Sequence, residues 1–496
     1  MPQAASGLLA LQIGARLGTF VLNQVLVRTA SPAVFGAANV QLELVLSTVL
    51  ALSREGTRAL MLRRQDALRR GDPMLHNLAL VPVWIGSVLS VVVGWAYVTY
   101  LAPAALWAQS GVAVPVSVAL YGLGAWLELW AEPLHTCALG LDAYVSIRVA
   151  MEAGGLVAKA VVTAVLLQPA CLAAMQRCVA AYVALSSEAC ALLAFAWGRV
   201  AYGAMVLLVG AVCLRGHARR WWWPTSAAAV WGDAPTRAFL RVTTGQAALK
   251  LVLTEGEKLA AARLTTLDEQ GAYALASNYG SLVARMLFQP LEESVRLRLS
   301  QGGEAAAWMS TLLRLHVLFG TGLVALAPPV AAPFLRLVAG PAWAHAAPIL
   351  GMYCWYVPVL GVNGVVEAFV QSVAPAHVLR VYSYVLVAAS AVMVGVLASP
   401  VAEARMVVAN IASLSVRALA STGDRRRDVL LMKHEILRAQ WIRGCALGVF
   451  ETSLRPEDCD GAAKCVSAIL LRTPRPLALA DLSSMTAAAL DTAGEA

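Results

Sequence analysis

Charged side chains are scarce in this sequence. Only 14% of its 496 residues are Asp, Glu, Lys or Arg, whereas 59% are hydrophobic, and the mean hydropathy is +0.68. A soluble domain does not need so much apolar surface to fill its core. The shortage of charge therefore predicts an all-α polytopic membrane protein.

The usual motifs of enzymes and metal sites are also missing. The nine cysteines include no CxxC pair, the seven histidines are dispersed, and neither a G-x-S-x-G elbow nor a P-loop occurs. We therefore expect no catalytic residues, no metal site, no cofactor and no enzymatic activity. The net charge of +9 comes mostly from arginines in short loops, which membrane topology explains without a nucleic-acid partner.

Long apolar windows recur along the chain. A bilayer core of about 30 Å needs roughly 20 apolar residues per helix, and this criterion predicts about twelve spans. They cover residues 7–28, 36–54, 76–102, 112–139, 149–168, 189–213, 238–262, 270–294, 307–335, 346–373, 379–399 and 405–421. Arginines gather in the loops after even-numbered spans, Arg54 and Arg58 among them, which predicts a cytosolic N-terminus and a cytosolic segment after residue 421.

The spans divide into two halves. We expect an N-terminal six-helix lobe at 1–213, a cytosolic basic, Trp-rich linker at 214–237, a C-terminal helical lobe at 238–421 and a polar, cytosolic tail at 422–496. Phe35-Gly36-Ala37-Ala38 and Gln270-Gly271-Ala272-Tyr273 stand in equivalent positions of the two halves. An even number of spans in each half makes the lobes parallel repeats, as in many alternating-access transporters.

Several charged or polar residues fall inside or beside the predicted spans. A charge at mid-membrane costs roughly 2.5 to 3.5 kcal/mol on insertion scales, so such residues either pair with one another or line a polar cavity. The candidates for substrate binding in a cavity are the cations Arg16, Lys159, Arg241, Lys250, Lys258 and Arg285. The candidates for coupling or pairing are Glu43, Glu55, Glu128, Glu132, Glu255, Glu257, Glu292, Glu293, Asn363 and Glu367.

Three groups of these residues are the most specific. Glu128 and Glu132 stand one helical turn apart, so two carboxylates that repel each other in a low dielectric are expected to share a proton, which permits proton coupling. Glu255 and Lys258 can pair on one helix face, either as a structural salt bridge or as part of a ligand site. Pro290, beside Glu292 and Glu293, predicts a kink that serves as a hinge or a ligand site.

A family resemblance rests on residues of the second half. The segment from Lys250 to Lys258, the run Asp268-Glu-Gln-Gly-Ala-Tyr273 and the stretch from Asn278 to Ser294 closely resemble the Rft family of oligosaccharide-lipid translocation proteins, in the MOP flippase superfamily that includes the MATE transporters. Weaker likeness covers most of residues 6–421. The resemblance extends the expected fold to two parallel, MATE-like lobes.

The resemblance also implies a function. It predicts a multi-pass protein of the endoplasmic-reticulum membrane that moves the lipid Man5GlcNAc2-PP-dolichol from the cytosolic to the lumenal leaflet for protein N-glycosylation. Its partners are then the dolichol-diphosphate oligosaccharide, membrane lipid and the N-glycosylation machinery. Two alternatives stay open: a non-transporting accessory protein of the same pathway, and a cation-coupled drug exporter of the same superfamily.

The family pattern and this sequence differ at the end. Family members are expected to have about fourteen spans, each of roughly 20 apolar residues. After residue 421 we find only short apolar stretches in a polar, Pro-containing segment. The sequence therefore predicts that the last helix pair is absent from residues 422–496.

Overall fold

The computed structural model describes most of the chain up to residue 421. The described residues are 20–21, 24–141, 144–179, 185–217, 221–224, 234, 236–238, 240–241, 244–245, 251, 259–283, 288, 305–373, 376–399 and 404–421. Within these ranges every regular element is helical and none is a strand.

Seven described segments are long and apolar enough to cross a membrane. They are Pro32–Leu62, Pro73–Leu101, Ala113–Gly140, Ser146–Leu166, Ser187–Cys213, Leu318–Val338 and Pro341–Glu367. Each matches one predicted span, and a shorter apolar helix at Tyr384–Ala398 falls on another. These segments confirm an all-α polytopic membrane protein. The total of twelve spans and the two six-helix lobes stay predictions, because spans 7–28 and 238–262 lie largely outside the described residues.

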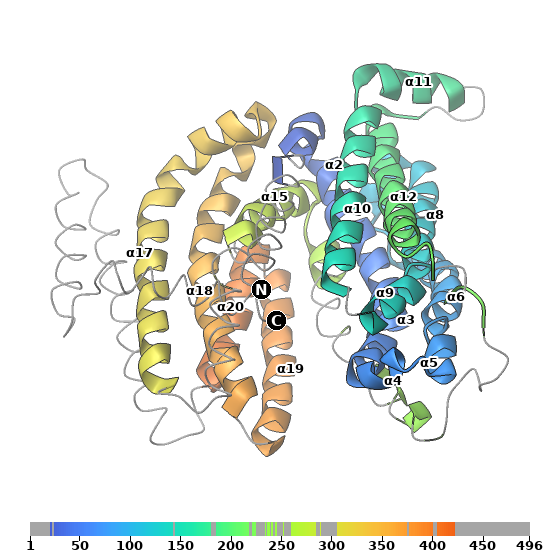
Figure 1. Cartoon of the computed structure of the whole chain (residues 1–496). Coiled ribbons are helices and arrows are strands. Elements are labelled where there is room, and N and C mark those ends of the chain that lie inside the picture. Colours follow the sequence, from blue (N-terminus) through green and yellow to red (C-terminus); the bar gives the residue numbers. More distant parts are fainter. Residues whose placement is uncertain are drawn as a thin grey trace. The chain divides into compact units, whose positions relative to one another are not determined.

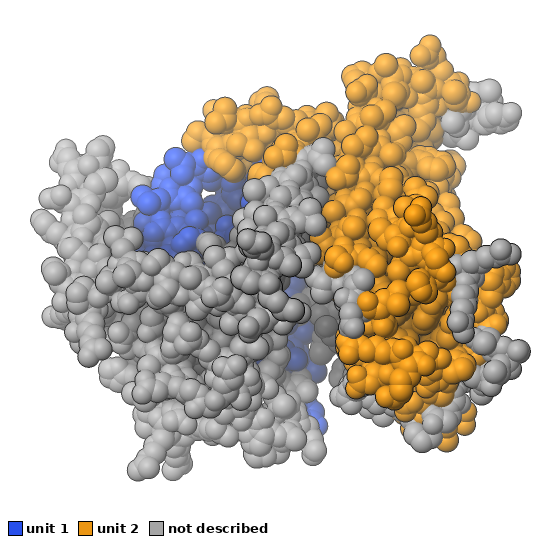
Figure 2. Space-filling view, in the orientation of Figure 1, with its two compact units in different colours: residues 1–10, 276–332, 347–496 blue, residues 11–275, 333–346 orange. Residues whose placement is uncertain are grey.

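The chain divides into two compact units, which Figure 2 shows in different colours. The first unit comprises residues 1–10, 276–332 and 347–496, and the second comprises residues 11–275 and 333–346. The predicted lobe boundary at 214–237 lies partly outside the described residues and stays a prediction, as does the cytosolic tail at 422–496.

The second unit contains most of the described helices (Figure 1). In chain order they are α2 (Pro32–Gly36), the π-helical turn η1 (Ala37–Leu42), α3 (Glu43–Arg63), α4 (Gln65–Arg69), α5 (Pro73–Leu78), α6 (Val81–Ala96), the π-helical turn η2 (Tyr97–Leu101), α7 (Ala104–Ser110), α8 (Ala113–Leu129), α9 (Glu132–Gly140), α10 (Tyr144–Leu166), α11 (Pro169–Val179) and α12 (Ser187–Cys213). Helix α12 packs against α8 and α10, and α6 packs against α3 and α8. The result is a bundle with α8 and α12 at its centre.

Local sequence signals explain where these helices begin and end. The side chains of Ser31, Asp72 and Ser186 cap α2, α5 and α12 by accepting hydrogen bonds from backbone N–H groups of the first turn. Pro32 and Pro73 follow two of these caps at the first helical position, where the missing N–H costs nothing. Gly111, with a φ of 48°, terminates α7 in a conformation that favours glycine.

Glycines allow the central helices to approach closely. A Cβ atom on Gly203 of α12 would lie 2.4 Å from the carbonyl oxygen of Gly124 on α8. One on Gly198 would lie 1.9 Å from the hydroxyl of Thr163 on α10. Because only small residues permit such contact between membrane helices, these positions fix α12 tightly against both neighbours.

A second close approach joins the equivalent motifs of the two sequence halves. Helix α15 (Leu267–Val283) begins within the second unit, and a Cβ atom on its Gly271 would lie 2.0 Å from the carbonyl oxygen of Pro32. A Cβ atom on Gly36 would lie 2.3 Å from the carbonyl oxygen of Leu267. The backbones of α2 and α15 are therefore in direct contact at these two glycines.

Buried amides support this contact. The Gln41 side chain in η1 donates to the carbonyl oxygen of Ala262 (2.8 Å) and to Oε1 of Gln270 (2.9 Å), and it accepts a hydrogen bond from the Tyr97 hydroxyl in η2 (2.7 Å). Gln41, Tyr97 and Gln270 are all almost completely buried. Both π-helical turns thus contribute a side chain to one hydrogen-bond network. Such turns are rare and occur mostly where a local structural or functional need exists.

The short segment 333–346 also belongs to the second unit. Trp343, in the 3-10 helix η4 (Pro341–Ala346), is 1% exposed, and its indole donates to the carbonyl oxygen of Val27 over 2.8 Å. Its ring meets Phe35 edge to face at 5.6 Å. A segment distant in the sequence therefore completes the core around α2.

The first unit contains helices of the second sequence half. They are the rest of α15, most of α17 (Ala305–Val338), α18 (Ala347–Val373), α19 (Ala376–Ala398) and α20 (Arg405–Ser421). Helix α20 packs against α18 and α19. Gly320 of α17 faces Pro358 of α18, where an added Cβ would lie 2.6 Å from the proline ring.

One predicted boundary was wrong. The span predicted to end at residue 54 continues to Leu62, and α3 extends to Arg63. Arg54 and Arg58 therefore lie within the helix and not in a cytosolic loop. The physical reason is that both side chains find carboxylate partners on neighbouring helices, so the helix need not end where the charges begin.

Candidate functional site

A cluster of five ionised side chains lies inside the second unit. Glu128 accepts hydrogen bonds from Arg54 (Oε1 to Nη1, 2.6 Å) and from Nη2 of Arg199, which binds the other carboxylate oxygen. Glu132 binds Arg58 through both oxygens, at 2.9 and 2.5 Å, and Arg54 at 3.4 Å. We call these five residues the ionic cluster.

Four helices bring these charges together. Arg54 and Arg58 are four residues apart on α3, so they share one helix face. Glu128 lies in the last turn of α8 and Glu132 begins α9, with a turn at Trp130 and Ala131 between the two helices. The glycine contact between α8 and α12 brings Arg199 within reach of Glu128.

Burial makes the pairing obligatory. Glu128, Glu132 and Arg199 are 7%, 3% and 6% exposed. Removing a carboxylate or guanidinium from water costs several kcal/mol, which only close pairing offsets. Three guanidinium groups face two carboxylates, so the ionic cluster carries one surplus positive charge when all five are ionised.

Further groups surround the ionic cluster. The guanidinium of Arg199 lies over the ring of Tyr202, 4.2 Å from its centroid, which adds a cation–π contact. Lys159 of α10 and Glu43 of α3 lie close enough to interact electrostatically with Arg199. Two of the predicted site residues therefore border the ionic cluster.

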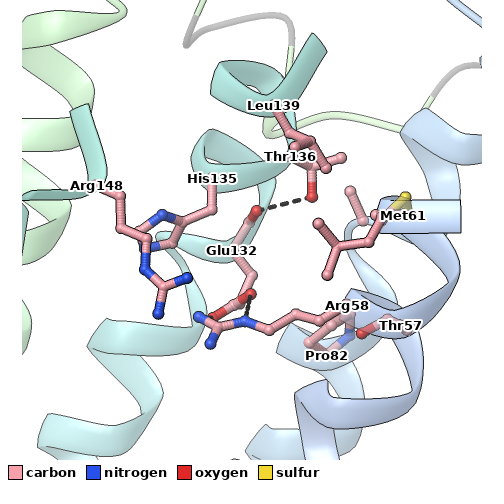
Figure 3. A pocket seen from close by; sticks show the side chains of 11 residues that line it. Thr57, Arg58, Met61, Pro82, Glu132, His135, Thr136, Leu139 and Arg148 are labelled. Atoms are coloured by element: carbon pink, nitrogen blue, oxygen red, sulfur yellow. Dashed lines mark hydrogen bonds and ion pairs between the residues drawn. The ribbon is translucent and has the colours of Figure 1, made fainter. Parts of the chain in front are cut away.

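A small pocket adjoins the ionic cluster between α3, α6, α9 and α10 (Figure 3). Its volume is about 90 Å³. Arg58, Glu132 and Arg148, with the imidazole of His135 beside them, form its charged side, and Met61, Leu62, Pro82 and Leu139 are among its apolar residues. The pocket is thus amphipathic, with charge on one side and hydrocarbon on the other.

The structure describes only some of the predicted site residues. Arg16, Lys250, Lys258, Arg285, Glu255, Glu257, Glu292 and Glu293, together with Pro290, lie outside the described residues. Arg241 and Glu55 are exposed. In the first unit, the buried Asn363 donates to Glu367 over 3.4 Å, one turn along α18.

Sequence reasoning missed three members of the ionic cluster. Arg54 and Arg58 were assigned to a loop because the helix was ended too early, and Arg199 was not singled out. Arg199 falls inside the predicted span 189–213, so the rule that a charge within a span needs a partner would have identified it.

The prediction that Glu128 and Glu132 share a proton considered only the repulsion between the two carboxylates. The two carboxylates do converge, on Arg54, but three guanidinium groups provide the counter-charge that a shared proton would otherwise provide. This arrangement favours a charge-compensated cluster over a proton carrier. Within the described ranges, no group of three or more His, Cys, Asp or Glu residues could hold a metal ion.

Comparison with known proteins identifies the relatives of this chain. A solved structure described as the inward-facing conformation of a multidrug resistance MATE family transporter of the MOP superfamily superposes with a TM-score of 0.52 at 12% identity, over 86% of this chain and 99% of that one. This similarity shows the fold alone.

Comparison by sequence finds proteins of higher identity than this structure. The Man(5)GlcNAc(2)-PP-dolichol translocation protein RFT1 of Eremothecium gossypii is 30% identical over 79% of this chain and 75% of its own length. The mouse protein of the same name, from Mus musculus, is 28% identical over 90% of this chain and 85% of its own length. The family model described as Rft protein matches residues 1–422. All of its described helices lie inside that match, and this chain belongs to the Rft protein family.

Proposed function

We propose that this chain translocates the dolichol-diphosphate-linked oligosaccharide Man5GlcNAc2-PP-dolichol from the cytosolic to the lumenal leaflet of the endoplasmic-reticulum membrane, for protein N-glycosylation. The observation that carries the proposal is the similarity to proteins named for this translocation, over three quarters or more of both chains. The polytopic helical fold, shared with a transporter, supports it.

The chemistry of the cargo fits a charged protein interior. A diphosphate and a polar sugar chain must cross the hydrocarbon layer, while the dolichol tail stays in lipid. Cations that face a protein cavity lower the cost of that passage. In this proposal Arg16, Lys250 and Arg285 line the cavity and neutralise the diphosphate, and the ionic cluster holds the helices of the second unit in place.

The direct test uses purified protein in vesicles with labelled lipid-linked oligosaccharide. Accelerated exchange between leaflets supports translocation, and exchange at the rate of protein-free vesicles contradicts it. In cells depleted of their own Rft protein, expression of the chain is expected to restore glycosylation, and the double variant Arg16→Ala/Lys250→Ala is expected not to. Full rescue by that variant at normal protein levels would contradict the cationic cavity.

One observation favours an accessory role. All five charges of the ionic cluster are bound to one another, which is what a scaffold with structural salt bridges requires. In this second candidate function the chain organises the N-glycosylation machinery without moving lipid. Rescue of glycosylation in cells combined with no leaflet exchange in vesicles would select this function over translocation.

A further inference from the structure

The pocket beside the ionic cluster contains a buried polar atom without a partner. His135 of α9 lines the pocket and is 8% exposed, and its Nδ1 finds no hydrogen-bond partner among the described residues. Leaving a buried ring nitrogen unpaired is unfavourable, because the nitrogen has lost its hydrogen bonds to water. A bound ligand or water that pairs with this nitrogen removes that cost.

Positive charge dominates around the pocket. The pocket is lined by Arg58 and Arg148 but by a single carboxylate, Glu132, which Arg58 and Arg54 already bind. Arg148 binds Glu152 one turn along α10. The ionic cluster and the Arg148–Glu152 pair together contain four arginines and three glutamates, so the pocket favours an anion.

The geometry of the charged side suits a tetrahedral anion. Figure 3 shows His135 and Arg148 next to each other, with Arg58 approaching Glu132 from α3. Guanidinium groups provide several donors in a planar fork, which matches the oxygens of a phosphate. The volume of about 90 Å³ accommodates a phosphate group but no sugar chain.

The apolar side indicates that the anion is attached to a lipid. Leu62, which lines the pocket, is 57% exposed and is the last residue of a segment long enough to cross the membrane, so we expect the pocket at the edge of the hydrocarbon region. Leu139, also in the lining, packs in a core cluster with Leu68 and Leu75, against which Trp221 rests. Trp side chains favour the headgroup level of a bilayer.

We propose that this pocket binds the phosphate group of a membrane lipid headgroup, through Arg148, Arg58 and His135, with the lipid chain against Met61 and Leu62. The lining of the pocket includes none of the residues assigned to the cavity of the proposed translocation. A chain that moves no oligosaccharide would still bind lipid here, so the two proposals fail independently.

The test measures lipid binding to the purified full-length chain by native mass spectrometry. Dioctanoyl phosphatidic acid is the probe, dioctanoyl glycerol controls for the headgroup, and inorganic phosphate controls for the lipid chain. We expect one saturable phosphatidic acid, and we expect Arg148→Gln to weaken its binding about tenfold, as the loss of a hydrogen bond to a charged group predicts.

Glu152→Gln is the matched control, because it breaks the same exposed ion pair but keeps the cation. It is expected to bind phosphatidic acid at least as tightly as the wild type, and both variants are expected to keep the wild-type melting temperature. Equal binding by Arg148→Gln and the wild type, or by dioctanoyl glycerol, would overturn the site. Displacement of phosphatidic acid by an equal concentration of inorganic phosphate would overturn the assignment to a lipid.

Discussion

Glu128 of α8 and Arg199 of α12 form an ion pair in which both residues are more than nine-tenths buried. The other oxygen of the same carboxylate binds Arg54 of α3. One carboxylate therefore connects three helices of the second unit. Replacing it would leave two guanidinium groups close together in a low dielectric.

We predict that Glu128→Gln lowers the free energy of unfolding by about 3 to 5 kcal/mol, the usual cost of breaking a buried ion pair. Thermal unfolding in detergent provides the measurement. Glu152→Gln serves as the control, since its pair is exposed and is worth less than about 1 kcal/mol. The double variant Glu128→Gln/Arg199→Gln should be more stable than Glu128→Gln alone, and if it is less stable the pairing is not the cause.

From the contact between α2 and α15 we predict that Gly36→Ala destabilises the protein. Its Cβ in Gly36→Ala would lie 2.3 Å from a backbone oxygen, which cannot rotate away as a side chain can. Overpacking of this kind costs typically 1 to 3 kcal/mol, and we expect the upper end of that range. Gly216→Ala is the control, because nothing lies within 4 Å of its added Cβ. Equal melting temperatures for the two variants would contradict the close approach.

The amide network predicts coupling between Gln41 and Gln270. Gln41→Leu leaves the Tyr97 hydroxyl and Oε1 of Gln270 without a buried partner, at a cost of about 1 to 3 kcal/mol. Because Gln270→Leu disrupts the same bond, the loss in the double variant should be smaller than the sum of the single losses. Strict additivity would show that the two amides do not interact. Gln168→Leu, at an exposed position, controls for the substitution itself.

The arginine distribution predicts the orientation of the chain. The span Pro73–Leu101 separates the turn at Gly71, next to Arg69 and Arg70, from the turn at Gly111. Positive loops remain cytosolic, so a loop with an Asn-Gly-Ser acceptor should be glycosylated when inserted after Gly111 and not when inserted after Gly71. A gel-mobility shift that an endoglycosidase reverses measures this. Modification at Gly71 alone would reverse the proposed topology.

The sequence was sufficient to predict the class of fold. Hydropathy depends on composition within a window of about 20 residues, so the seven described spans fall where the apolar runs are. The sequence did not predict which residues far apart in the chain come into contact. The pairing of Glu128 with Arg199 depends on how closely α8 and α12 pack at Gly124 and Gly203, and no local pattern encodes that distance.

The same limit explains the error at Arg54 and Arg58. A charge at the end of an apolar run usually marks a loop, but these two side chains face carboxylates on α8 and α9. The carboxylate partners of Arg54 and Arg58 can be identified only from the packed arrangement of the helices. The pocket at His135 was not predicted either, because its lining comes from four separate helices.

The contact between Gly36 and the start of α15 has a consequence for biogenesis. Ribosomes add about 5 to 20 residues per second, so Gly271 emerges roughly ten to fifty seconds after Gly36. During that interval the first helices are already in the membrane, while the Gln41 amide lacks its partners near residue 270. The early helices therefore reach their final packing only when the second half of the chain arrives, and we expect the insertion machinery to shield that surface until then.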